Sequence, residues 1–252
     1  MEVNLKSFRK LVIAVFLIVG CDNKNEPLYT HKNQAVVILD KTNSVCYTNS
    51  LPKLRQELIR NFEQTYVSTT KDIQYSRLVI TGDTRVFPVP CRFENDYPVG
   101  DDDDRMIQTE RQRWKMDKRK WIFDELKQVD SLIQSPCKSN TTDIFSIFDG
   151  IQQVQNTKGP WDSLNVFIFS DMVNTNRTIN MKTGITMENA NAKGKRICQD
   201  LIEHGQITTE KNGNLYLTIY TPDNMDKTAL VKQFWKGFFE QWGLRETHYH
   251  FE

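Results

Sequence analysis

Beyond its first twenty residues the chain has no apolar run long enough to form a membrane-spanning helix. Cysteine is scarce, at five residues, and no two cysteines have the C-x-x-C spacing of a zinc site. The four histidines have no metal-ligand spacing with a cysteine or an acidic cluster, and no Ser/His/Asp or Cys/His arrangement indicates a nucleophilic enzyme. The formal charge is only +1, so nothing favours electrostatic binding of nucleic acid.

The N-terminus has the order of a bacterial export signal. Basic residues between Lys6 and Lys10 precede an uncharged apolar run over residues 11–20, and Cys21 follows at once. The run has the length of a signal-peptide core and is too short to span a bilayer, which takes about 20 residues. The segment Ile18-Val19-Gly20-Cys21 resembles the lipobox of bacterial lipoproteins.

This resemblance implies that residues 1–20 are a signal peptide and that residues 21–33 are a lipidated Cys21 followed by a polar tether. The protein is then anchored to a membrane of the bacterial cell envelope, periplasmic or surface-exposed, because several acyl chains anchor stably without a spanning helix. The alternative is an ordinary signal peptide or an anchor helix that happens to precede a cysteine.

Four further cysteines, Cys46, Cys91, Cys137 and Cys198, lie in the exported part. Export would let disulfides persist, but four cysteines allow three pairings and the sequence selects none. A bridge between Cys91 and Cys137 and free, buried thiols are both open.

The chain after Cys21 has the length of one large domain, predicted over residues 34–252. Apolar runs predict strands over 35–39, 75–80, 165–169 and 215–220, and amphipathic spacing predicts helices over 51–66, 109–134, 143–154, 190–204 and 226–242. Residues 86–105, rich in proline and aspartate, read as an irregular insertion. Strands that alternate with helices predict an α/β fold: a three-layer, doubly wound (Rossmann-like), mainly parallel sheet with helices on both faces.

Three loops near strand ends carry acids and hydroxyls. Asp40 ends the first apolar run, and Thr42 and Ser44 follow it at alternate positions. Thr142 precedes a predicted helix, and Asp171 follows another apolar run. Because ligands bind at the carboxyl ends of such strands, these side chains predict a hard oxygen site suited to Mg²⁺ or Mn²⁺.

An apolar strand followed by D-x-[ST]-x-S, then a Thr that opens a helix, then an apolar strand followed by S-D, resembles the metal-ion-dependent adhesion site of von Willebrand factor A (VWA) domains. The resemblance implies that Asp40, Thr42, Ser44, Thr142 and Asp171 hold the metal and that a protein partner supplies the last ligand, a carboxylate. Thr141 is the fallback for Thr142. Thr42 stands where Ser is commoner, and the Gly-Gly that often precedes the second-loop Thr is missing.

Other interpretations of the same residues remain. Asp40-Lys41-Thr42, with Thr81-Gly82-Asp83 after the second strand, resembles the motifs of haloacid dehalogenase-like phosphatases, in which Asp40 would be the nucleophile. Thr42 cannot act as the general acid-base that those enzymes carry at its position.

A structural lipoprotein with a degenerate metal site is the third interpretation. The run Asp101–Asp104 can hold Ca²⁺ or be a solvated loop. We expect a non-enzymatic, metal-dependent protein-binding module.

Overall fold

The computed structural model describes most of the chain after residue 32. The described residues are 33–46, 56, 73–80, 82, 88–93, 95, 97–101, 103–137, 139–156, 163–175, 180–181, 183–210, 212–221 and 228–252. The chain divides into residues 1–30 and 31–252, and every described residue belongs to the second unit. The predicted signal peptide, Cys21 and, apart from Gln56, the helix predicted over 51–66 lie outside the described residues. None of the helices within them is long and apolar enough to cross a membrane.

The described strands form one sheet: β1 (Asn33–Asp40), β2 (Ile73–Ile80), β3 (Val89–Arg92), β4 (Ser163–Phe169), β5 (Leu215–Tyr220) and β6 (Tyr249–Phe251). Their order across the sheet is β3-β2-β1-β4-β5-β6, and every neighbouring pair is parallel except β2 and β3. The predicted mainly parallel α/β sheet is therefore confirmed.

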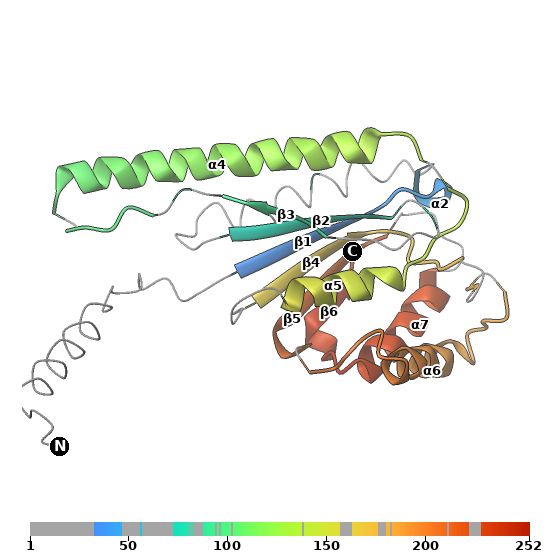
Figure 1. The fold of residues 1–252 in the computed structure, drawn as a ribbon. Helices are drawn as coiled ribbons and strands as arrows, with labels where there is room; N and C mark the ends of the chain where they lie inside the picture. The colour runs from blue at the N-terminus through green and yellow to red at the C-terminus, as the bar shows by residue number, and fades with distance from the viewer. Residues whose placement is uncertain are drawn as a thin grey trace, which may run out of the picture. The chain divides into compact units, whose positions relative to one another are not determined.

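Helices cover both faces of the sheet, which gives the three layers predicted (Figure 1). The helical segments are α2 (Asn43–Cys46), α4 (Arg105–Gln134), α5 (Ser146–Asn156), α6 (Ala190–Glu203), α7 (Thr228–Gln241) and the short 3₁₀ turns η1 (Asn212–Asn214) and η2 (Glu246–His248). Helix α4 lies over one face, and α5, α6 and α7 lie on the other (Figure 1).

Strand β1 is apolar at consecutive positions because both of its faces are buried. Its odd-numbered residues Ala35, Val37 and Leu39 belong to the core beneath α4, with Ile122, Leu126 and Val129. Its even-numbered residues Val36 and Ile38 belong to the larger core on the opposite face, which includes the aromatic residues of α7. The same alternation determines which face of the sheet each side chain after β1 points toward, and this arranges the side chains of the site.

The segment predicted as an irregular insertion contains strand β3, so that prediction was wrong for residues 89–92. Pro90 pairs with Ser76 in the antiparallel ladder. Proline has no N–H to donate, and an edge strand tolerates this because it has a partner on one side only. The prolines are therefore compatible with an edge strand, whereas the sequence analysis took them as a sign of irregular structure.

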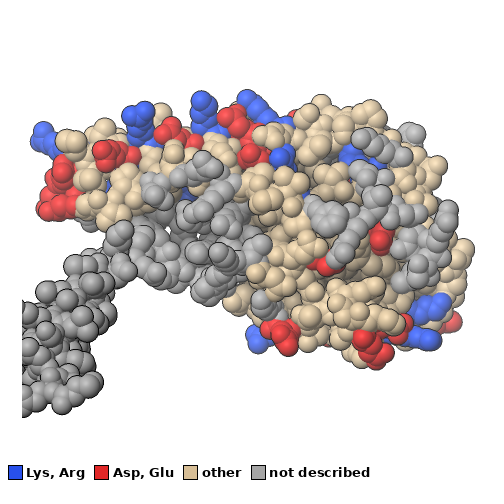
Figure 2. Space-filling view, viewed as in Figure 1, with Lys and Arg blue, Asp and Glu red and all other residues tan. Residues whose placement is uncertain are grey.

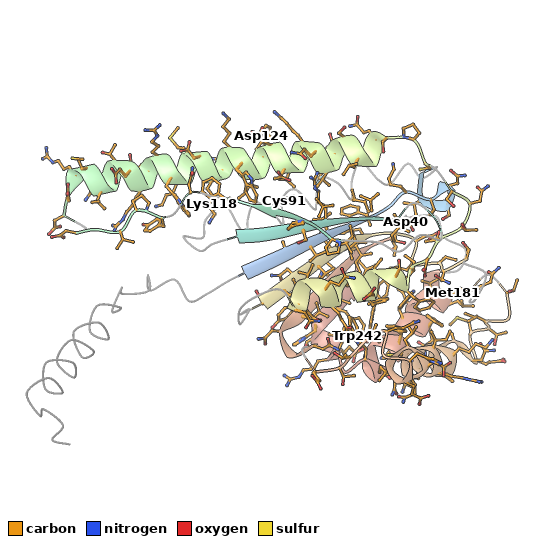
Figure 3. All side chains as sticks on the ribbon, viewed as in Figure 1. Asp40, Cys91, Lys118, Asp124, Met181 and Trp242 are labelled. Atoms are coloured by element: carbon orange, nitrogen blue, oxygen red, sulfur yellow. The ribbon has the colours of Figure 1, made fainter. Side chains whose placement is uncertain are left out.

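Helix α4 begins at Arg105, earlier than predicted, because the aspartate run supplies its N-terminal cap. The Asp104 carboxylate accepts a hydrogen bond from the Met106 amide at 2.8 Å, and the Asp101 carboxylate accepts one from the Asp103 amide at 3.2 Å. Such capping satisfies amides that have no partner within the helix. Further along, the buried Lys118 ammonium lies 4.6 Å from the centre of the Trp114 ring, on the side of α4 that faces β3 (Figure 3).

The outer face of α4 is a mixed-charge surface on which blue and red side chains interleave (Figure 2). The sequence places acids and bases three and four residues apart along this face: Glu110, Arg113, Asp117, Lys120, Asp124 and Lys127. Lys127 and Asp124 are 3.8 Å apart with both side chains more than half exposed. Pairs of this kind stabilise by about 0–1 kcal/mol, so this face is a solvated one.

Candidate functional site

The site lies where the order of the strands reverses. From β1 the chain goes to β2 on one side, whereas β4 pairs with β1 on the other side. In doubly wound sheets this switch point leaves a crevice at the carboxyl ends of the two strands. Asp40 is the last residue of β1, and Ser170 and Asp171 directly follow β4. Figure 3 shows Asp40 at this end of the sheet, beside α2.

Asp40 is the centre of a hydrogen-bond network within the first loop. One of its oxygens, Oδ1, accepts from the Thr42 amide at 2.9 Å and from the Thr42 hydroxyl at 2.6 Å. The Thr42 and Ser44 hydroxyls are 3.2 Å apart. The other oxygen, Oδ2, accepts from the Ser170 hydroxyl at 2.7 Å, which joins the first loop to the third. The predicted Asp40, Thr42 and Ser44 therefore share one network.

The second loop is fixed to the first through backbone and amide contacts. The Asn43 amide donates to the Ser139 carbonyl at 2.8 Å, and Thr42 and Ser139 form a parallel β-bridge. The Asn43 side chain donates to the Asn140 side chain at 2.5 Å. These contacts hold the chain leading to Thr142 beside the first loop.

The second loop is also fixed to the third. The Thr142 amide donates to the Thr175 hydroxyl, and the Thr175 amide donates back to the Thr142 carbonyl, both at 2.9 Å. The Ile144 amide donates to the Asn174 side chain at 2.9 Å. Each of the three loops is therefore hydrogen-bonded to the other two.

The third loop has an unusual backbone conformation. Met172 has a φ of 55°, which a non-glycine residue adopts only when its surroundings hold it there. The Met172 amide donates to the Ser170 hydroxyl at 2.9 Å, and the Met172 carbonyl accepts from the indole Nε1 of Trp235 in α7 at 2.8 Å. The Asp171 carboxylate accepts from the Val173 amide at 2.9 Å. Helix α7 thus helps to set the turn that carries Asp171.

Two carboxylates lie close enough in the site to affect each other. Burial and, to a smaller extent, the nearby Asp171 carboxylate raise the pKa of Asp40 to about 6, although the hydrogen bonds from Thr42 and Ser170 oppose the rise. Two buried carboxylates that repel each other are an arrangement that a divalent cation stabilises.

The oxygens present fit Mg²⁺ or Mn²⁺. A hydroxyl has one proton and two lone pairs, so the Thr42 hydroxyl that donates to Asp40 still has lone pairs for a cation. Asp40, Thr42, Thr142 and Asp171 are all at most 4% exposed, whereas Ser44 is exposed. No three side chains of the His, Cys, Asp or Glu types meet anywhere in the described part of the chain. The predicted ligands are two carboxylates and neutral hydroxyls, a kind of oxygen donor that hard cations accept.

The fallback residue Thr141 has a different environment from Thr142. Its hydroxyl lies 3.0 Å from the Ser139 hydroxyl, and its side chain is half-buried. Thr142 is 1% exposed. Sequence reasoning gave no role to Ser170, although the S-D pair contains it, and it did not find the links through Asn174 and Thr175. The S-D pair of the motif could have indicated Ser170, whereas no motif indicated Asn174 or Thr175.

The loop of residues 173–189 follows Asp171 and Met172 along the chain. Within the described residues, Thr175 and Asn180 form an antiparallel bridge, and Met181 is 2% exposed in the main core. The Met181 amide donates to the Asn174 carbonyl at 2.8 Å. This part of the loop is therefore anchored in the core beside the third site loop.

The phosphatase motifs are described only in part. Thr81 and Asp83 lie outside the described residues, and the Gly82 carbonyl accepts from the Asp143 amide at 3.4 Å. Both oxygens of Asp40, the residue that would be the nucleophile, accept hydrogen bonds.

The structure also tests the predictions for the cysteines. Cys91 and Cys198 are free thiols and Cys137 is disulfide-bonded. A Cys91–Cys137 bridge is therefore wrong.

Comparison with known proteins gives likeness of fold alone. No protein-family model matches the sequence, and no curated protein does. Among solved structures, the chain is similar to the mussel byssus proximal thread matrix protein 1, with 12% identity and a TM-score of 0.39 over 81% of this chain and 41% of that one. It is similar to the human COPII-coat protein Sec24c, with 11% identity and a TM-score of 0.43 over 85% of this chain and 29% of that one. It is also similar to the manganese-loaded TRAP protein of Plasmodium vivax, with 11% identity and a TM-score of 0.42 over 89% of this chain and 70% of that one.

The chain thus spans less than half the length of the first two of these structures.

Proposed function

We propose that this chain is a lipid-anchored envelope protein whose VWA-like domain binds a protein partner through a divalent metal. Asp40, Thr42, Ser44, Thr142 and Asp171 hold Mg²⁺ or Mn²⁺, and the partner supplies a carboxylate as the last ligand. Cys21 carries the lipid.

One observation carries the proposal: three loops far apart in sequence are hydrogen-bonded pairwise at the switch point of the sheet. The contacts from Asp40 to Ser170, from Asn43 to Ser139 and from Thr142 to Thr175 make this arrangement. A site held by three loops is preorganised, so binding a cation costs little conformational entropy.

The cation would supply a Lewis-acidic position that accepts a further oxygen ligand. The chain's own residues determine how acidic that position is. The Asp40 oxygens accept hydrogen bonds from the Thr42 and Ser170 hydroxyls, so part of the carboxylate charge is already compensated within the network. Neutral hydroxyls from Thr42, Ser44 and Thr142 then leave more of the cation's charge uncompensated than carboxylates would, and this favours an anionic ligand from a partner.

The metal is tested by thermal unfolding of the protein with and without Mn²⁺. A ligand that binds only the folded state at one hundred times its dissociation constant stabilises by about 2.7 kcal/mol. For a domain of this size we expect a rise in Tm of about 5–10 °C, reversed by EDTA. Thr142→Val removes one hydroxyl with little change in shape and should abolish most of the rise. Thr141→Val is the matched control and should keep it.

Three outcomes separate the interpretations. No rise in Tm for the folded wild-type protein contradicts a metal site and favours a structural lipoprotein. Turnover of an aryl phosphate that Asp40→Asn abolishes contradicts the binding function and favours the phosphatase. Binding of acetate to the Mn²⁺-loaded protein, lost in EDTA, supports the carboxylate ligand from a partner.

A further inference from the structure

Among the described residues, the last turn of helix α4 has no cation of its own. An α-helix leaves its last carbonyls without intrahelical partners and has partial negative charge at this end, which lysine and arginine stabilise. The last turn of α4 contains no basic residue. Ser135, the C-cap residue, has an extended backbone (φ −65°, ψ 152°), and its hydroxyl donates a hydrogen bond to the Leu132 carbonyl at 2.7 Å.

The cation comes from the first loop of the site. The Lys41 ammonium donates to the Ser135 carbonyl at 2.5 Å, across 94 residues of sequence. Lys41 is 5% exposed, and its amide donates to the Ile80 carbonyl at 2.8 Å. Both ends of this residue are therefore fixed, one to strand β2 and the other to the end of α4.

The alternation of β1 explains this arrangement. Ala35, Val37 and Leu39 face α4, and Lys41 continues the same parity beyond the end of the strand. Asp40 and Thr42 have the opposite parity, and both take part in the site network. The middle residue of D-x-T thus reaches α4 while the residues on either side of it face the site.

We propose that Lys41 is a positioning residue: by capping the C-terminal end of α4 it fixes the backbone between Asp40 and Thr42 in the geometry that binds metal. This rests on the proposed metal site. The cap joins a 30-residue helix on one face of the sheet to a loop at its edge, so the position of α4 and the affinity for the metal are linked.

The test is the Mn²⁺ affinity of Lys41→Met, which keeps an unbranched apolar stem and removes the ammonium. Outer residues that orient metal ligands typically change affinity by about 10–100-fold, and we expect a loss of about tenfold in the folded variant. Lys193→Met is the matched control, because the Lys193 ammonium also donates to a backbone carbonyl, that of Gly184, but this hydrogen bond is exposed to solvent. It should bind Mn²⁺ as the wild type does. Lys41→Arg retains a cation and should recover most of the affinity.

A second measurement is made without metal. Hydrogen exchange of the amides at residues 131–135 should be faster in Lys41→Met than in the wild type and in Lys193→Met, because local opening reports the loss of a cap. Should Lys41→Met not fold, Lys41→Gln keeps a shorter, neutral donor and takes its place in both measurements. Unchanged Mn²⁺ affinity overturns the proposal, and so does unchanged exchange. If the wild type binds no Mn²⁺, the proposed function fails, and the exchange measurement alone decides whether Lys41 holds the end of α4.

Discussion

At the scale of single residues, Asp40 has the most informative environment in the molecule. It is 3% exposed and accepts three hydrogen bonds, which favour its charged form, yet burial and Asp171 raise its pKa from 3.8 to about 6. The desolvation cost therefore exceeds the gain from hydrogen bonding. A carboxyl whose pKa is higher in the folded state takes up its proton on folding, so the metal-free protein loses stability as the pH rises through this window.

We predict that the free energy of unfolding of the metal-free protein falls between about pH 4 and pH 6 by up to about 3 kcal/mol from Asp40, since one unit of pKa is worth about 1.4 kcal/mol. Asp40→Asn should remove this part of the slope. Urea unfolding at several pH values in EDTA, for both proteins, measures it. The difference between the two curves isolates Asp40 from the other acids, and parallel curves would show that Asp40 titrates normally.

The same environment predicts how the site responds to metal. A proton on Asp40 competes with the cation, so affinity for Mn²⁺ should weaken as the pH falls below the pKa of about 6. This reverses the stability trend, because the bound cation neutralises the negative charge on Asp40 that Asp171 otherwise repels.

The sequence predicted the residues whose chemistry is visible in the motif and missed those that act through geometry. Asp40, Thr42 and Ser44 follow from their spacing after an apolar strand, and the structure gives them one network. Lys41 occupies the unspecified middle position of D-x-T, and its contact depends on the end of a helix 94 residues away. Trp235 looked like any core aromatic residue, because its bond to the Met172 carbonyl depends on how α7 packs.

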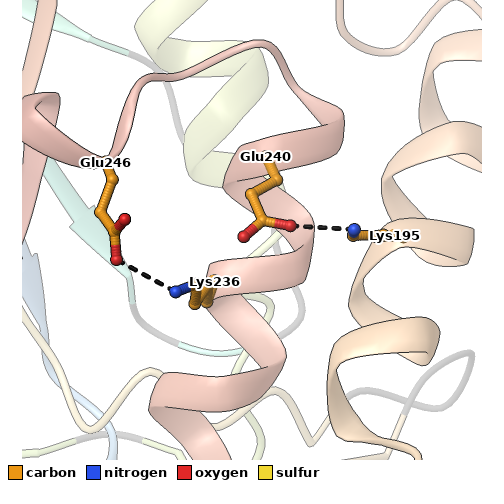
Figure 4. Close-up of polar contacts among 4 residues, drawn as sticks. All are labelled: Lys195, Lys236, Glu240 and Glu246. Atoms are coloured by element: carbon orange, nitrogen blue, oxygen red, sulfur yellow. Dashed lines mark hydrogen bonds and ion pairs between the residues drawn. The ribbon is translucent and has the colours of Figure 1, made fainter.

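At the scale of elements, α6 and α7 pack closely through two glycines. A Cβ on Gly237 would lie 2.1 Å from the Asn191 carbonyl oxygen, and one on Gly194 would lie 2.0 Å from the Phe234 carbonyl oxygen. Both obstacles are backbone atoms, which cannot rotate away. An ion pair at the surface adds to this contact, because Lys195 and Glu240 join α6 to α7 at 2.9 Å (Figure 4). A second pair, Lys236 and Glu246, joins α7 to η2 at 3.0 Å.

We predict that Gly237→Ala destabilises the protein by about 1–3 kcal/mol, the usual cost of overpacking. Helix propensity has the opposite sign, since Ala is better than Gly inside a helix by about 0.5–1 kcal/mol. Chemical unfolding therefore decides between the two effects. Gly213→Ala is the matched control, because a Cβ there meets nothing within 4 Å, and it should cost nothing. A Gly237→Ala protein as stable as the wild type would mean that the two helices are further apart than described.

The elements that the sequence predicted best are those with strong periodicity. The strand over 215–220 has its predicted bounds, and the helix predicted over 190–204 ends one residue earlier, at Glu203. Strand β6 was missed because three residues, Tyr249–Phe251, are too few to show alternation. Strand β3 was missed because its prolines look like breakers until the partner strand is known. Short edge strands are set by the sheet they join and carry little signal of their own.

At the scale of the whole molecule, the chemical states of the five cysteines test the proposed lipid anchor. Cys198 is fully buried and its pKa is raised to about 12 by burial, while Cys91 is half-buried with a pKa raised mainly by burial. Thiolate is the reactive form. In the native protein we therefore predict that N-ethylmaleimide labels Cys91 slowly and Cys198 only on unfolding, and that Cys137 is labelled only after reduction, because it is disulfide-bonded.

The disulfide partner of Cys137 follows by elimination, and the proposed lipid anchor decides between the last two candidates. Five cysteines less two free thiols and Cys137 itself leave Cys21 and Cys46. A lipidated Cys21 has its sulfur in a thioether and cannot form a disulfide. Non-reducing peptide mapping of the protein from a bacterial membrane should therefore find Cys137 joined to Cys46, with acyl chains on the Cys21 peptide. A Cys21–Cys137 peptide would contradict the anchor outright, since the same sulfur cannot hold both bonds, and it would leave the metal site untouched because no proposed ligand is a thiol.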